Sequence, residues 1–269
     1  MSVGDERAIG VFDSGVGGLT VLKALIEKLP RESTVYLGDT ARVPYGTKSA
    51  EVVTRYSLTN ARFLLQSDIK LLVVACNTAS AVALPKMAAV LPIPVLGVIE
   101  PGAKLAAERS RSGRVGVIGT LGTIRSGAYR RALEAARSGV TVVDKACPLF
   151  VPLAEEGWVA GEVPARVARS YLEDFAESGI DTLVLGCTHY PVLRGVIAQA
   201  VGPGVALVDS AEASSAAVVD LLSSRAQLAT GVEEPVHRYY VTDVPDDFVR
   251  VAERFLGHSI ESAEQVDIA

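Results

Sequence analysis

The chain has few cysteines, and their spacing predicts no disulfide bond between them. Its 269 residues contain three, at Cys76, Cys147 and Cys187. An odd number at such wide spacings is a poor disulfide framework and includes no C-x-x-C pair for metal binding or redox chemistry. We therefore expect free thiols in a reducing compartment, which indicates a cytoplasmic protein.

Long apolar runs and a basic stripe are also missing. The longest apolar stretches, such as Ile69 to Ala75 and Thr182 to Leu185, fall far short of the roughly 20 residues that a membrane-spanning helix needs. Met1 to Ala8 is polar and charged and lacks the apolar core of a secretory signal. The formal net charge is −5, and the lysines and arginines are scattered. Direct binding to nucleic acid or to a membrane is therefore not expected.

What the sequence does contain is an alternation of apolar, β-branched runs with helical patterns. The predicted strands are Ile9 to Phe12, Thr34 to Leu37, Lys70 to Ala75, Pro94 to Ile99, Arg114 to Ile118, Thr141 to Asp144, Thr182 to Gly186, Val205 to Val208 and His237 to Val241. Leucines at helical spacing follow the first strand, and a second apolar stripe follows Pro164. Alternation of this kind predicts an α/β fold with parallel sheets flanked by helices.

The two halves of the chain echo each other. Gly10-Val11-Phe12-Asp13-Ser14 lies 66 residues before Cys76, and Gly116-Val117-Ile118-Gly119-Thr120 lies 71 residues before Cys187. We therefore predict two similar lobes with mainly parallel sheets, related by a pseudo-twofold axis. One lobe comprises residues 1–98 with 209–269, the other comprises residues 99–208, and the active site lies between them. A chance echo within one doubly wound sheet is the alternative interpretation.

Cys76 and Cys187 are the most informative residues of this echo. Each ends an apolar run and begins a polar one, so each should project beyond the carboxyl end of a strand, where open α/β sheets bind ligands. The segments that follow resemble helix entries, whose free N–H groups would favour a thiolate. Two such thiols on opposite faces of one carbon could remove a proton from one side and deliver one to the other. The pair therefore suggests inversion of a stereocentre.

Other interpretations of the cysteines stay open. Each could be a small buried core residue, as most free cysteines are. Cys147 has no mirrored partner, which favours a structural role. Zinc could in principle use Cys76, Cys187 and His189, but a structural zinc site needs four ligands and usually closer spacing. We therefore assign no metal site.

The loop from Asp13 to Thr20 follows the first predicted strand and enters a helix. Its glycines would let an anion approach the backbone at that helix N-terminus. Gly15 and Gly17 match two of the three glycines of a dinucleotide-binding fingerprint, and Asp39 stands where a ribose-binding acid would. A nicotinamide enzyme is thus one alternative, although the carboxylate of an amino acid would use the same N–H groups.

Three further side chains are candidates for proton transfer or for binding a substrate ammonium group. Asp13 and Glu155 are acidic, with a capping or solvated carboxylate as the plainer interpretation. His189 lies two residues beyond Cys187 and can move protons near neutral pH. His237 and His258 have no such setting and are interpreted as structural or surface residues.

With these residues in view, the chain resembles the bacterial glutamate racemases of the cofactor-independent aspartate/glutamate racemase superfamily. Six ordered blocks carry the resemblance, which covers nearly the whole chain. They are Gly10-Val11-Phe12-Asp13-Ser14-Gly15-Val16-Gly17-Gly18, Asp39-Thr40-Ala41-Arg42-Val43-Pro44-Tyr45-Gly46, Ala75-Cys76-Asn77-Thr78-Ala79-Ser80, Gly97-Val98-Ile99-Glu100-Pro101-Gly102, Cys147-Pro148-Leu149-Phe150-Val151-Pro152-Leu153 and Leu185-Gly186-Cys187-Thr188-His189-Tyr190-Pro191.

The resemblance implies racemisation of glutamate between two α/β domains, without pyridoxal phosphate or any other cofactor and without metal. By that match Cys76 would be the base toward D-glutamate and Cys187 the base toward L-glutamate. Asp13 would assist proton transfer near Cys76, and His189 with Glu155 near Cys187. The implied substrate-binding residues are Asp13, Ser14, Tyr45, Gly46, Asn77, Thr78, Thr188 and His189. The implied cellular role is to supply D-glutamate for peptidoglycan.

The resemblance also leaves alternatives and partners open. An aspartate racemase of the same superfamily would differ in the length of its substrate side chain. A homodimer is expected by resemblance alone. Some glutamate racemases also bind and inhibit DNA gyrase, so a protein-binding role could accompany catalysis, although no segment of this sequence identifies such a surface.

Overall fold

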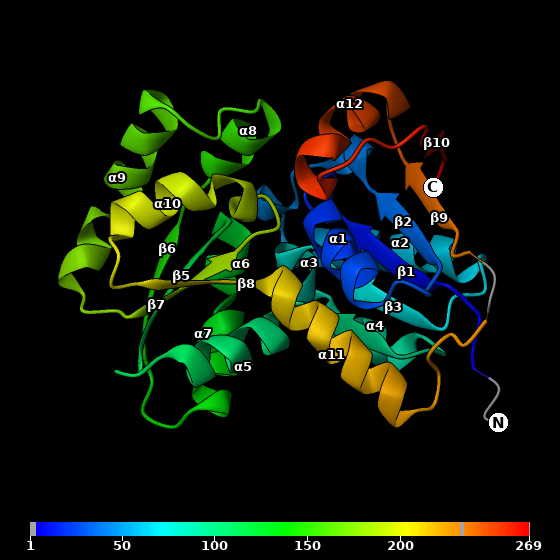
Figure 1. The fold of residues 1–269 in the computed structure, drawn as a ribbon, viewed down its shortest axis with the longest axis horizontal. Helices are drawn as coiled ribbons and strands as arrows, with labels where there is room; N and C mark the ends of the chain where they lie inside the picture. The colour runs from blue at the N-terminus through cyan, green and yellow to red at the C-terminus, as the bar shows by residue number, and fades with distance from the viewer. Residues whose placement is uncertain (1–3, 232–233, 269) are drawn as a thin grey trace.

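A computed structural model describes residues 4–231 and 234–268, with parallel strands in two sheets and helices on the faces of both (Figure 1). The strands are β1 Ile9–Asp13, β2 Thr34–Gly38, β3 Leu71–Val74, β4 Val95–Gly97, β5 Arg114–Gly119, β6 Thr141–Ala146, β7 Thr182–Gly186, β8 Ala206–Asp209, β9 His237–Val241 and β10 Glu264–Gln265. The α-helices are α1 Leu19–Lys28, α2 Ala50–Leu65, α3 Asn77–Val82, α4 Leu84–Val90, α5 Ile99–Arg109, α6 Leu121–Ser126, α7 Ala128–Ala136, α8 Phe150–Glu155, α9 Glu162–Glu177, α10 Arg194–Val201, α11 Ser210–Ser224 and α12 Pro245–Leu256. Short 3-10 helices are η1 Thr40–Arg42, η2 Tyr45–Thr47 and η3 Tyr190–Leu193. Within the described ranges, no helix is both long and apolar enough to cross a membrane.

The two sheets repeat one strand order. The larger sheet runs β10-β9-β2-β1-β3-β4 and the smaller runs β6-β5-β7-β8, with parallel pairing between all of these neighbours. The order β2-β1-β3-β4 therefore recurs as β6-β5-β7-β8. The predicted α/β class with two parallel sheets is confirmed, and the shared order is what a pseudo-twofold relation between the lobes would produce.

The central strands are almost entirely buried, because helices cover both faces of each sheet. Every residue of β1, β3 and β7 is buried. Strands covered on both faces read as continuous apolar runs in the sequence rather than as alternating ones. This explains why the central strands are recognisable from composition alone.

The largest differences from the sequence prediction concern two strands. The run predicted as a strand from Pro94 to Ile99 is a strand only over Val95–Gly97, and α5 begins at Ile99. Here one apolar, β-branched run continues from the strand into the buried first turn of a helix. The end of the strand therefore cannot be located from the hydrophobic pattern. The short strand Glu264–Gln265 was not predicted, because both residues are exposed and polar.

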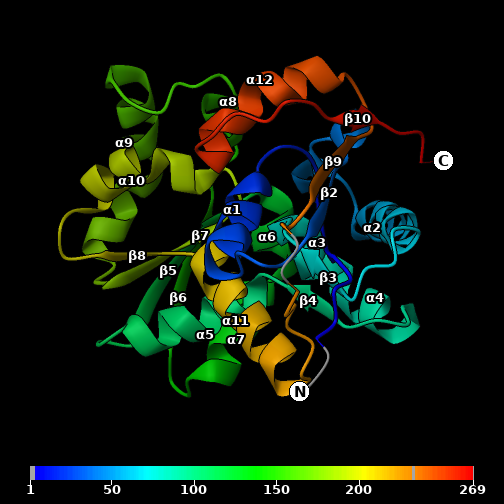
Figure 2. The ribbon, with the colours of Figure 1, turned by 45° about the vertical axis from the view of Figure 1, so that its right-hand side comes forward.

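The chain passes from one sheet to the other and back. The larger sheet takes its strands from residues 9–97 and 237–265, and the smaller takes its strands from residues 114–209. On the return, α11 packs against both α1 and α5 and so bridges the two sheets (Figures 1 and 2). The exact division into lobes at residues 98 and 209 stays a prediction.

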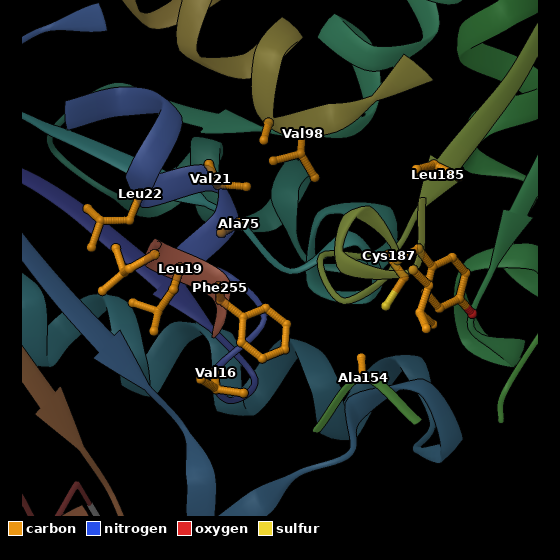
Figure 3. Close-up of a cluster of buried hydrophobic side chains, with 14 of the residues drawn as sticks. Val16, Leu19, Val21, Leu22, Ala75, Val98, Ala154, Leu185, Cys187 and Phe255 are labelled. Atoms are coloured by element: carbon orange, nitrogen blue, oxygen red, sulfur yellow. The ribbon is translucent and has the colours of Figure 1, made fainter. Parts of the chain in front are cut away.

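The largest hydrophobic cluster crosses between the two halves of the molecule. It joins Leu19 and Phe255, from α1 and α12, to Ala154, Leu185 and Cys187 of the other half (Figure 3). Because the lobes share this core, the carboxyl ends of their central strands are held in a fixed relation. The site described next lies at those ends.

Candidate active site

Chemically reactive side chains lie where the central strands of both sheets end. Asp13 is the last residue of β1, Cys76 lies just beyond the neighbouring β3, and Cys187 follows β7 directly. In the second sheet, the residue that corresponds to Asp13 is Gly119, which pairs with Gly186 in register. The structure therefore brings the two predicted thiols to equivalent strand ends, but it places a carboxylate beside one of them alone.

Asp13 is fully buried and is held from both lobes. Its Oδ2 accepts a hydrogen bond from the Gly15 N–H at 3.0 Å, and the Thr188 hydroxyl donates to Oδ1 at 3.3 Å. Gly18 lies so close that an added Cβ would be 2.4 Å from the Asp13 Cβ. Burial raises the pKa of Asp13, against the opposing effects of the His189 charge and of these hydrogen bonds. Asp13 can therefore accept a proton more readily than an exposed aspartate.

Cys76 is a buried thiol whose neighbours favour the protonated form. Its Sγ donates to the Ser14 hydroxyl oxygen at 3.7 Å. Cys76 is also the N-cap residue of α3. Burial, followed by the nearby Asp13 carboxylate, raises the pKa of Cys76 to about 12. The charge of Cys187 also raises that pKa, so the two sulfurs lie close enough to affect each other. At neutral pH Cys76 is therefore a proton donor.

Cys187 has a different set of partners. Its Sγ lies 3.8 Å from His189 Nδ1, and His189 Nε2 lies 2.9 Å from Glu155 Oε1. Burial acts to lower the pKa of His189, but the hydrogen bonds to Cys187 and Glu155 outweigh it and raise that pKa to about 10. A protonated imidazole therefore stands beside Cys187, where it would balance the charge of a thiolate.

The helix entry predicted after Cys187 begins as a 3-10 helix and not as an α-helix. The 3-10 helix η3 begins at Tyr190 with Pro191 in its first turn, and α10 begins at Arg194. Favourable charge near this sulfur therefore comes from the imidazole of His189 rather than from the N-terminus of an α-helix. Gly17 makes the arrangement possible, because a Cβ there would lie 2.4 Å from His189 Nδ1.

Amide and hydroxyl groups next to Cys76 complete the site and reach across to the other lobe. Tyr129 of α7 donates to the Asn77 side-chain oxygen at 2.7 Å, which turns the amide nitrogen the other way. That nitrogen is buried and has no hydrogen-bond partner within the described structure. A buried donor without a partner is costly, so Asn77 Nδ2 marks a place for a ligand acceptor.

Two threonines of the second lobe belong to the site but were not predicted. The hydroxyl oxygens of Thr120 and Thr123 lie 2.9 and 3.2 Å from that of Thr78. They lie 3.0 Å from each other. The signal for Thr120 was present, since it follows Gly119 as Ser14 follows Asp13. Thr123 and Tyr129 carry no comparable signal, because their place in the site depends on how α6 and α7 pack.

The predicted binding residues Tyr45 and Gly46 lie at the edge of this cluster. The Tyr45 hydroxyl donates to Asp39 Oδ2 and accepts from Asn60 at 3.1 Å, so it is already engaged. Gly46 lies against Thr120, where an added Cβ would be 2.6 Å from the threonine Cβ. The backbone of this segment, rather than the phenol, is what a ligand could meet.

The structure also weighs against the other interpretations of the sequence. The Asp39 carboxylate is fully buried and bonded to Arg42, Tyr45 and Thr242, so it is not free to bind a ribose. Among the described residues, no three histidine, cysteine or acidic side chains form a group that could hold a metal ion. Cys147 is buried with its Sγ 3.8 Å from the Lys145 carbonyl oxygen.

Comparisons with known proteins agree with this geometry. The family model for Asp/Glu/hydantoin racemases matches residues 9–218. A glutamate racemase from Geobacter metallireducens is 59% identical over 262 residues, which make up 97% of this chain and 97% of that one. Among solved structures, a glutamate racemase isoform from Bacillus anthracis and the glutamate racemase from Francisella tularensis in complex with D-glutamate each match at 40% identity. Each has a TM-score of 0.92, with 98% of both chains covered. The chain therefore belongs to the Asp/Glu/hydantoin racemase family and is a racemase.

Proposed function

We propose that this protein is a glutamate racemase in which Cys76 and Cys187 exchange protons with the two faces of the α-carbon. The observation that carries the proposal is the pair of buried thiols at equivalent strand ends of two facing lobes. Their relatives support glutamate as the substrate, since the similar full-length proteins are glutamate racemases. The chemistry needs neither pyridoxal phosphate nor metal, because the thiols themselves accept and donate the proton.

In the direction from L-glutamate, Cys187 acts as the base. Its thiolate, beside protonated His189, takes the α-proton, and the electron pair of the broken C–H bond stays on the substrate. Cys76, protonated because its pKa is about 12, then donates its proton to the opposite face and becomes a thiolate. The product is D-glutamate, and the thiols have exchanged protonation states. The reverse reaction uses the same groups in the opposite order.

The α-proton of an amino acid is far less acidic than a thiol, so the site must stabilise the developing negative charge. Donors that face the strand ends can do this, including the unpartnered Asn77 amide and the hydroxyl of Ser14. Between turnovers in this direction, the Cys76 thiolate must regain a proton and the Cys187 thiol must release one to solvent. We assign the first transfer to Asp13, and we expect the charge of His189, held by Glu155, to favour the second by stabilising the Cys187 thiolate. Exclusion of water by the closed lobes strengthens each of these interactions.

The test is racemisation of L-glutamate in D₂O, followed by circular dichroism and by loss of the α-proton signal. We expect C76A and C187A each to lower the rate by about 10²-fold or more, as is typical of removing a general acid or base. The matched control is C147A, which removes the third cysteine and should leave the rate close to that of the wild type. Far-UV circular dichroism checks folding, and unchanged rates in C76A or C187A would contradict the two-thiol mechanism.

Rates on glutamate and aspartate distinguish the two substrates within the family. We expect kcat/KM to be higher for glutamate, and a higher value for aspartate would overturn the substrate assignment while leaving the two-thiol chemistry intact. The homodimer stays a prediction, which sedimentation velocity would test against the 28.2 kDa mass of one chain.

In the cell, we propose that the D-glutamate serves peptidoglycan synthesis. A bacterial host that needs added D-glutamate should grow without it when it expresses this protein. The C76A and C187A variants should not rescue growth. Rescue by either variant would show that growth without added D-glutamate does not depend on the two-thiol reaction.

A further inference from the structure

A cavity of about 300 Å³ opens beside the site, between the two lobes. Gly46, Lys48 and Ser49 line it from the first lobe, and Gly122 and Arg125 line it from the second. Thr78, which is buried at 3% exposure, also contributes to the wall. The cavity therefore adjoins the threonine cluster of the site at Thr78.

The charge of this cavity is opposite in sign to that of the whole protein. Lys48 and Arg125 are the charged side chains among its lining residues, which include no carboxylate. Neither cation has an ion-pair partner within the described parts of the chain, although the formal net charge is −5. Cations left unpaired on opposite walls of one cavity attract an anion rather than each other.

The first turn of α2 adds to the positive potential. Ser49 caps this 16-residue helix by accepting from the Val52 N–H at 3.3 Å, and both Ser49 and Ala50 line the cavity. The positive end of the helix dipole therefore faces the same space. The acidic residue of that turn, Glu51, lines a separate cavity on the other side of the helix.

The cavity adjoins polar groups of the site at Thr78, which is among its lining residues. The Thr78 hydroxyl bonds to Thr120 and Thr123, and the preceding residue is Asn77 with its unpartnered amide nitrogen. An anion admitted at the mouth would therefore pass from cationic side chains to neutral donors. The cationic groups at the mouth would attract a carboxylate, and the neutral donors further in would bind it without forming a strong ion pair.

We propose that this cavity is the substrate entrance and an outer binding site for a carboxylate, with Lys48 and Arg125 as the capturing residues. The inference rests on the proposed function, because it takes the substrate to be an amino acid with two carboxylates. It goes further by assigning a route into the site and a recognition step that precedes the chemistry. Neither side chain touches the reacting atoms, so both affect the binding of the substrate and not the proton transfer.

The test is the charge-reversed variant K48E/R125E, assayed for racemisation of glutamate at low and high salt. We expect kcat/KM to fall by about ten-fold or more at low ionic strength, within the range of electrostatic steering effects. The loss should lie mainly in KM. Added salt should reduce kcat/KM of the wild type but not of the variant, because it screens attraction in one and repulsion in the other.

The matched control is K86E/R169E, which makes the same change in net charge at exposed positions of α4 and α9. It should keep the KM and the salt dependence of the wild type. Thermal unfolding of both double variants checks their folding. Equal KM values and salt slopes in K48E/R125E and wild type would overturn the entrance. A wild type that does not racemise glutamate would instead overturn the proposed function.

Discussion

At the scale of single residues, the surroundings of the two site thiols differ more than the repeated sequence suggests. Cys76 has a carboxylate and a hydroxyl near it, Asp13 and Ser14, whereas Cys187 has His189. The first environment raises the pKa of a thiol, and the second offers a positive charge to a thiolate. One lobe can therefore hold a proton donor while the other holds a base, which is the state that the proposed reaction needs to begin on L-glutamate.

The partner of His189 gives a pH prediction. The pKa of His189 is about 10, and the Glu155 carboxylate is one of the groups that raise it. E155Q removes that negative charge, so the imidazole should lose its proton at a lower pH. We expect the alkaline limb of kcat/KM to move toward lower pH and the rate near pH 9 to fall by roughly ten-fold, as measured by a pH profile.

The control for this variant is E156Q, which alters the next, exposed carboxylate and has no contact with the imidazole among the described ion pairs. Its pH profile should match that of the wild type. An unchanged alkaline limb in E155Q would show that the charge of Glu155 does not control the protonation of His189.

At the scale of elements, α12 holds the Glu155 segment in place from the opposite lobe. Arg254 Nη1 donates to the Ala154 carbonyl at 3.1 Å and also to the Glu155 carbonyl. Its guanidinium lies against Gly157, where an added Cβ would be 2.6 Å from Nη2. The next residue, Phe255, packs edge-on against the His189 ring with 5.4 Å between centroids. One helix turn therefore supports both members of the His189 and Glu155 pair.

This contact makes Arg254 a positioning residue. R254M keeps the length of the side chain but removes both donors, so we expect kcat/KM to fall by several-fold to about ten-fold. The alkaline limb of the pH profile should move in the same direction as in E155Q, because the carboxylate is less well placed. R254K, which retains a donor, should recover part of the loss.

The control on the same helix is R250M, which removes an exposed cation paired with Asp247 one turn earlier. It should leave both rate and profile unchanged. A lower rate in R254M with the profile of the wild type would indicate a general loss of structure rather than positioning of Glu155.

At the scale of the whole molecule, a buried ion pair ties the start of the chain to the segment that returns from the second lobe. The side chains of Lys70 and Glu32 are 0% and 3% exposed, with Nζ 2.6 Å from Oε2. Lys70 also donates to the carbonyls of Asp5 and Gln227, and Glu32 accepts from the Ala229 N–H. The pair thus joins the N-terminal segment, the α1–β2 connection and the chain beyond α11.

Breaking this pair should destabilise the protein without touching the site. K70M leaves Glu32 buried without its cation, and loss of one partner of a buried pair costs about 3–5 kcal/mol. We expect that decrease in the free energy of unfolding, measured by urea titration. The double variant K70M/E32Q should recover part of it, since it removes the unpaired charge. A single variant as stable as the wild type would show that the pair contributes little.

The sequence by itself determined the class of fold and the two thiols. Buried parallel strands appear as continuous apolar runs, and a reactive residue at the end of such a run must lie at the carboxyl edge of a sheet. Cys76, Cys187 and Asp13 are therefore visible as strand-end residues. These features depend on neighbouring positions in the chain, which is why local patterns suffice to find them.

The tertiary structure decided which residues meet. Glu155 and His189 are in contact although 34 positions separate them in the sequence. Arg254, which supports that contact, lies 99 positions beyond Glu155. Tyr129 turns the Asn77 amide from the opposite lobe, and the Tyr45 hydroxyl is directed to Asp39 and not to the site. No local period encodes such pairs, because they form when helices of different lobes pack and buried polar groups must find partners. The different surroundings of the two thiols follow from that packing.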